Sequence, residues 1–139
     1  MTIPKIIHQL WIGPKQPPTK FMDTWKDAHE KEGFEYIRWT KDEFKKRNFV
    51  SKLVGKIDDM IEINGKADII RWEILYEYGG VFIDADAYCI EPVTYLVEKY
   101  QAFAGYENEK VRNAGWAGNN RQYDDVLART HALIATGTM

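Results

Sequence analysis

Segments with strand-like and helix-like patterns of hydrophobic residues alternate along the chain. Short runs rich in β-branched and aromatic residues predict strands over 5–12 (KIIHQLWI), 34–40 (FEYIRWT), 81–84 (VFID) and 101–107 (QAFAGYE). The segments between them predict helices over 19–31, 40–47, 67–78 and 92–99. Alternation of strands and helices is typical of an α/β fold with a mostly parallel central sheet, which we therefore expect here.

The helix over 67–78 has one apolar face, because its large residues recur at helical spacing: Ala67, Ile70, Ile74, Leu75 and Tyr78. Gly79 and Gly80 follow at once, and glycines of this kind commonly end a helix. Thr40 and Glu43 stand at capping-box spacing, which predicts the start of the short basic helix over 40–47.

Composition and charge limit the function. With 139 residues, 45% of them hydrophobic and 29% charged, the chain can form one globular domain over residues 1–139. A net charge of −2 provides no positive field for a polyanion, so we expect no nucleic-acid partner. Cys89 is the one cysteine, which excludes an internal disulfide.

The start of the sequence, MTIPKIIHQLWIG, interrupts its apolar residues with Lys5, His8 and Gln9. It therefore lacks the continuous apolar core of a signal peptide. No segment approaches the ~20 apolar residues of a membrane span. We expect a soluble, cytoplasmic protein without a transmembrane segment.

Acidic and aromatic residues stand where two predicted strands end. Ligands of open α/β sheets gather beyond the carboxyl ends of the strands, and Trp11 lies at one such end, Asp84 and Asp86 at another. In an extended segment, Asp84 and Asp86 would project to the same side and Ala85 would face away. Two carboxylates suit Mn²⁺ or Mg²⁺, whose shell a diphosphate substrate can complete. The alternative is a solvated strand end, since an Asp-x-Asp arises by chance in roughly one such chain in two.

Asp68 and Arg71 are three residues apart on one face of the helix that leads into this strand. An Arg there could engage the oxygens of a ligand, and an Asp could accept hydrogen bonds from hydroxyls. A simple helix-surface ion pair explains the spacing equally well. For His8, on the first strand, a structural role is favoured over a catalytic one.

The segments IPKIIHQLWIG and KADIIRWEILYEYGGVFIDAD together resemble the DXD-containing glycosyltransferases of the Och1-like type (glycosyltransferase family 32), whose core is similar to that of the clostridial glucosylating toxins. The resemblance covers roughly residues 3–120. It implies a GT-A (Rossmann-like) fold, a UDP- or GDP-sugar donor and a divalent metal. It further implies transfer of the sugar, with retention of configuration, to a hydroxyl of a glycan, lipid or protein acceptor.

The resemblance also assigns roles to individual residues. Asp86 corresponds to the direct metal ligand, and Asp84 to the residue that contacts ribose and sugar hydroxyls while assisting the metal. Asp68 and Arg71 correspond to the pair that holds the donor sugar. Trp11 corresponds to the aromatic residue beside the nucleotide base.

Asn113, in VRNAGW, resembles an Asn that approaches the donor. The chain departs from the family pattern at Phe82, where many relatives carry a Tyr, and at Thr138, which replaces a Pro. Relatives also continue well beyond Met139, so the chain is either a small member or a fragment that lacks part of the acceptor region.

Two other functions fit the same residues. A non-catalytic module could bind a sugar nucleotide or glycan without turnover, aided by five Trp and eight Tyr. A glycoside hydrolase would instead use two carboxyl groups that flank the scissile bond. Metal-dependent binding without transfer would identify the module, and metal-independent cleavage of simple glycosides would identify the hydrolase.

Overall fold

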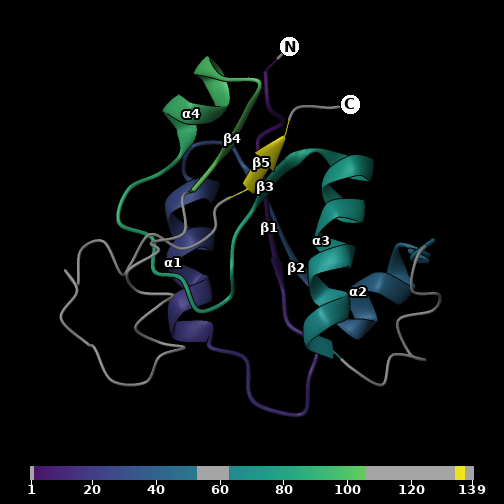
Figure 1. The fold of residues 1–139 in the computed structure, drawn as a ribbon. Helices are drawn as coiled ribbons and strands as arrows, with labels where there is room; N and C mark the ends of the chain where they lie inside the picture. The colour runs from purple at the N-terminus through teal and green to yellow at the C-terminus, as the bar shows by residue number, and fades with distance from the viewer. Residues whose placement is uncertain (1, 53–62, 106–133, 137–139) are drawn as a thin grey trace, which may run out of the picture.

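The computed structural model describes residues 2–52, 63–105 and 134–136. The elements follow in the order β1 (Ile6–Leu10), α1 (Thr19–Glu30), β2 (Glu35–Trp39), α2 (Lys41–Lys46), α3 (Ile63–Tyr78), β3 (Gly80–Phe82), α4 (Thr94–Lys99), β4 (Ala102–Ala104) and β5 (Ile134–Thr136). Helix α1 lies on one face of the sheet, and α2 and α3 lie on the other (Figure 1). No helix in these three ranges is long and apolar enough to cross a lipid bilayer.

The sheet has the strand order β2-β1-β3-β5-β4. Strand β1 lies between β2 and β3 and pairs in parallel with both. Strand β5 is antiparallel to β3 and to β4, so it alone runs against the other four strands. The expected α/β fold with a mostly parallel sheet is confirmed, although the sequence patterns did not predict β5.

The limits of the elements differ from the expected ones by a few residues. Helix α3 begins at Ile63, four residues before the predicted start. Strand β3 covers Gly80–Phe82 where 81–84 was expected. Asp84 therefore lies beyond the strand, because its carbonyl accepts a hydrogen bond from the Ala87 N–H (3.1 Å) that closes a turn.

Both faces of the sheet are covered by apolar clusters. Successive residues of β3 point to opposite faces, so Val81 joins the cluster that contains Trp25 of α1, and Phe82 joins the cluster that contains Ile74 of α3. Strands covered on both faces lose the alternation of apolar and polar residues. This burial explains the near-continuous apolar run that leads to Asp84.

The predicted cap of α2 and the predicted glycine end of α3 are confirmed. The Thr40 hydroxyl caps α2 by accepting a hydrogen bond from the Glu43 N–H (3.3 Å). After α3, Gly79 and Gly80 adopt φ values of 66° and 93°, a region that other residues rarely enter. The two glycines turn the chain directly from α3 into β3.

His8 is fully buried in β1 and has a structural role. The Trp39 indole N–H donates to its Nδ1 (3.0 Å), so Nε2 carries the ring proton and donates to the Gly79 carbonyl (2.8 Å). The imidazole thus joins β2 to the end of α3 through the core. Burial, the largest effect, lowers the pKa of His8 from 6.5 to about 4.

Gly80→Ala should destabilise the fold by about 2–4 kcal/mol, because a side chain there is strained in both backbone and space. A Cβ at Gly80 would lie 2.7 Å from the Ile6 carbonyl oxygen, and φ is +93°. Gly13→Ala is the matched control, since nothing lies within 4 Å of its Cβ position. Urea unfolding of both variants tests this expectation, and equal midpoints would contradict it.

The buried His8 should also make stability depend on pH. Its pKa is lower in the folded state (about 4) than in the unfolded chain (6.5), so the unfolded state binds the proton first as the pH falls. The contribution of the neutral His8 ring to the free energy of unfolding is complete above pH 6.5. It is lost as the pH falls from 6.5 to 4, which lowers the free energy of unfolding by about 3 kcal/mol. An NMR titration of the His8 ring gives the folded-state value directly, and a midpoint near 6.5 would contradict the burial.

Candidate functional site

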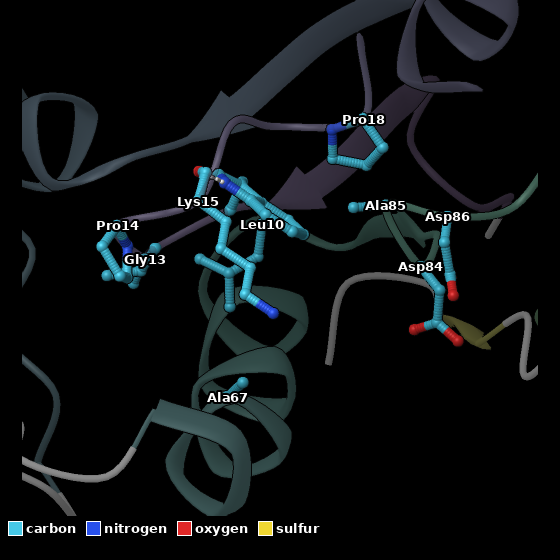
Figure 2. A pocket seen from close by; sticks show the side chains of 11 residues that line it. Leu10, Gly13, Pro14, Lys15, Pro18, Ala67, Asp84, Ala85 and Asp86 are labelled. Carbon is cyan, nitrogen blue, oxygen red and sulfur yellow. Dashed lines mark hydrogen bonds between the residues drawn. The ribbon is translucent and has the colours of Figure 1, made fainter. Parts of the chain in front are cut away.

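A pocket of about 620 Å³ opens at the carboxyl ends of β1 and β3. Figure 2 shows it between the loop that follows β1, the first part of α3 and the segment that follows β3. Its lining residues are Leu10, Trp11, Ile12, Gly13, Pro14, Lys15, Pro18, Ala67, Asp84, Ala85 and Asp86. The structure thus brings Trp11, Asp84 and Asp86 together at one rim of the sheet. This position agrees with the prediction that all three lie at the carboxyl ends of strands.

The two aspartates do not lie on an extended strand. The last backbone–backbone hydrogen bond described between β1 and the β3 segment runs from the Ile83 N–H to the His8 carbonyl (2.9 Å), and Asp84–Ala87 then forms the turn. Ala85 was expected to face away from the carboxylates, but it lines the pocket with them, since a turn does not alternate its side chains as a strand does. Asp84 is half-buried and Asp86 is exposed.

Arg71 binds Asp84 more closely than it binds Asp68. Its Nη2 lies 2.8 Å from Asp84 Oδ1 and 3.7 Å from Asp68 Oδ1. The Arg71 and Asp84 side chains are 17% and 29% exposed, whereas that of Asp68 is 73% exposed. The guanidinium also lies over the Phe82 ring, 5.0 Å from its centroid. The expected pair within α3 is therefore secondary to a bond between α3 and the acidic turn.

Gln9 is a site residue that the sequence analysis missed. Its buried amide donates from Nε2 to the Asp84 carbonyl (3.2 Å) and accepts at Oε1 from the Tyr36 hydroxyl (2.6 Å). Burial raises the pKa of Tyr36, so the phenol keeps its proton. Arg38 donates to the same hydroxyl (3.3 Å) and pairs with Asp23 (2.9 Å). The one available signal was a polar residue within the apolar β1 run.

Helix α1 fixes the segment that follows the turn. Its side chains make three hydrogen bonds to backbone atoms there: Trp25 Nε1 donates to the Ala87 carbonyl (2.9 Å), Thr24 Oγ1 accepts from the Cys89 N–H (2.9 Å), and His29 Nε2 accepts from the Val93 N–H (3.0 Å). Trp25 and His29 are buried. The turn that carries Asp86 is therefore held on both sides.

Trp11 is half-buried, and its position is set by two hydrogen bonds. Its backbone N–H donates to the Trp39 carbonyl (2.9 Å), and its indole Nε1 donates to the Lys15 carbonyl (2.9 Å). The indole is thus fixed beside the pocket that it lines. Asn113, the other expected donor contact, lies outside the described residues.

The acidic turn fits a small divalent cation. Asp84 and Asp86 supply carboxylate oxygens to one pocket, and such oxygens are the ligands that Mg²⁺ and Mn²⁺ prefer. No group of three His, Cys, Asp or Glu side chains forms a metal cage within the described ranges. One or two carboxylates with substrate phosphates are a usual set for Mg²⁺, so the two aspartates are sufficient protein ligands.

Residues 18–103 match the family model "Glycosyltransferase sugar-binding region containing DXD motif". The chain belongs to this family. Asp84-Ala85-Asp86 is the one Asp-x-Asp sequence within the matched residues, so this turn is the motif of the family description. The resemblance to DXD-containing sugar transferases is confirmed at this level.

Several curated yeast proteins are similar to the chain. Inositol phosphoceramide mannosyltransferase 3 of Schizosaccharomyces pombe is 34% identical over 63% of this chain and 25% of its own length. Inositol phosphoceramide mannosyltransferase 2 of the same yeast is 38% identical over 63% of this chain and 26% of its own length. A mannosyl phosphorylinositol ceramide synthase of Saccharomyces cerevisiae is 36% identical over 63% of this chain and 23% of its own length.

The chain therefore spans about a quarter of the length of these three relatives. No solved structure matches it.

Arg71→Met should lower the free energy of unfolding by roughly 1–3 kcal/mol, because it removes the guanidinium that lies 2.8 Å from the half-buried Asp84 carboxylate. Asp68→Asn should cost less than about 0.5 kcal/mol, since that pair is long and exposed. Urea unfolding measures both values, and amide chemical shifts of Asp86 and Ala87 report on the turn. A larger loss for Asp68→Asn would contradict this ranking.

Proposed function

We propose that this chain forms the donor-binding part of a metal-dependent glycosyltransferase, which moves a sugar from a nucleotide-sugar donor to an acceptor hydroxyl. The observation that carries the proposal is the fixed Asp84–Asp86 turn. Both aspartates line one pocket with Trp11 at the carboxyl ends of the parallel strands β1 and β3. The family description adds support, because it names a sugar-binding region that contains this motif.

The two aspartates have different surroundings, which suggests different roles. Asp86 is exposed and would be the direct ligand of Mn²⁺ or Mg²⁺. Asp84 is held by Arg71 and by Gln9, so it would assist at the metal and accept hydrogen bonds from ribose and sugar hydroxyls. A bound divalent ion would neutralise the charge that grows on the diphosphate leaving group.

The sugar would be held from α3. Asp68 is exposed beside Arg71 and can accept hydrogen bonds from sugar hydroxyls, while Arg71 orients the site through Asp84. Trp11 offers an aromatic surface to the nucleotide base, because its indole is fixed at the pocket. Holding the reactants in one geometry can account for several kcal/mol of the reaction barrier.

The names of the relatives suggest the sugar and the acceptor. Two are mannosyltransferases for inositol phosphoceramide, so we favour mannose as the transferred hexose and a lipid head group as the acceptor, before a glycan or a protein. The donor would be a GDP- or UDP-sugar. Retention of configuration, by attack on the face that the diphosphate leaves, follows from the resemblance to the Och1-like transferases and the clostridial toxins.

A panel of GDP- and UDP-sugars, with and without Mn²⁺, tests the function. We expect metal-dependent hydrolysis or transfer with one donor, and calorimetry should show that GDP or UDP binding weakens when the metal is chelated. Equal affinity in excess chelator would contradict the metal site. Binding without any turnover would instead support the non-catalytic module.

Asp86→Ala and Asp68→Ala should separate two defects. Asp86→Ala removes a proposed metal ligand, so the bare nucleoside diphosphate should bind more weakly at fixed Mn²⁺ while the fold stays intact. Asp68→Ala removes a contact proposed only to the sugar, so the diphosphate should bind nearly normally while turnover falls by orders of magnitude. Calorimetry and initial rates give the two values.

The exposed position of Asp68 makes its result decisive. Turnover within about twofold of the unmodified protein, a change below roughly 0.5 kcal/mol in transition-state binding, would remove Asp68 from the donor site. Circular dichroism of each variant serves as the folding control.

A further inference from the structure

Lys15 is the only cationic residue among the described residues that line the pocket. It belongs to the loop that joins β1 to α1, across the pocket from Asp84 and Asp86. Figure 2 shows its side chain leaving this loop and extending toward the space between Ala67 and the acidic turn. Within the described ranges, the ion pairs of the protein do not include Lys15.

The loop presents Lys15 from a fixed backbone. The Trp11 indole donates to the Lys15 carbonyl (2.9 Å), which closes the loop between the two residues. Pro14, Pro17 and Pro18 flank Lys15, and each proline ring restricts φ to a narrow range. Ordering this backbone therefore costs little when a ligand binds.

The charges around the pocket indicate which ligand group the Lys15 ammonium group can bind. Asp84 and Asp86 repel an anionic ligand, so a diphosphate there needs cations close to its oxygens. Arg71 does not line the pocket, and its Nη2 is bonded to Asp84 (2.8 Å). Lys15 is a flexible point charge on a long stem, a form of cation suited to phosphate oxygens.

We propose that Lys15 binds a phosphate oxygen of the donor's diphosphate, opposite the acidic turn. The assignment rests on the proposed function, because it needs a phosphorylated ligand in this pocket. It adds a cation from the loop to the two carboxylates that would hold the metal. Trp11 and Lys15, joined by one hydrogen bond, would then contact the base and the phosphates of the same nucleotide.

Calorimetry with guanosine, GMP and GDP, and with the uridine series, tests the assignment at fixed Mg²⁺. Lys15→Met keeps the apolar stem and removes the charge, so GDP or UDP affinity should fall about tenfold while nucleoside affinity stays unchanged. Lys15→Arg should keep most of the affinity. Lys20→Met is the matched control, since Lys20 is an exposed lysine of α1 outside the pocket lining.

The difference in GDP or UDP affinity between Lys15→Met and the unmodified protein should also become smaller at high salt. Screening weakens the charge interaction of Lys15 that the variant lacks. Equal losses for nucleoside and diphosphate, or diphosphate affinity within twofold of the unmodified protein, would overturn the proposal. A loss seen only with inositol phosphate as the probe would place Lys15 at an acceptor phosphate and overturn it as well.

If the proposed glycosyltransferase function is wrong, the unmodified protein should bind no nucleoside diphosphate at all. The Lys15 assignment is then wrong as well. If the unmodified protein binds the diphosphate and transfers sugar while Lys15→Met behaves normally, only the Lys15 assignment is wrong.

Discussion

The bonds that converge on Asp84 are the constraint on which the candidate site depends. Its carboxylate accepts from Arg71 of α3, its carbonyl accepts from Gln9 of β1, and the same carbonyl accepts from Ala87 across the turn. A turn beyond the end of a strand has few backbone partners of its own. These bonds replace the sheet ladder that stops at Ile83, so the backbone that carries the two acidic side chains keeps a defined place beside the pocket.

Each of the two side chains that bond to Asp84 is itself supported by a further contact. Gln9 is fixed by the Tyr36 hydroxyl, and Arg71 lies on the Phe82 ring within the apolar cluster of α3. A half-buried ion pair contributes little net stability, but the loss of one partner leaves a charge without compensation. The Arg71–Asp84 bond therefore acts mainly by specifying one arrangement of helix and turn.

The core that supports this arrangement also contains a polar connection. His8 accepts from Trp39 and donates to Gly79, which ties β2, β1 and the end of α3 together at the point where Gly79 and Gly80 redirect the chain. Buried polar groups are tolerated when each is hydrogen-bonded, and both ring nitrogens of His8 are. On the other face, α1 fixes the backbone that follows Asp86 through Trp25. The motif is thus braced from both layers of helices.

The sequence by itself determined the α/β class, the helix that ends before Gly79 and the rim that Trp11 shares with the Asp-x-Asp motif. Hydrophobic periodicity, glycines and the order of elements along the chain can all be read from the sequence. It also indicated the family, because the motif residues stand in a fixed order along the chain. Tertiary structure alone decided that the motif is a turn, that Arg71 binds Asp84 more closely than Asp68, and that β5 joins the sheet. These features depend on contacts between residues distant in sequence, such as Gln9 and Asp84. A local sequence pattern does not show which distant side chains come into contact when the helices pack on the sheet.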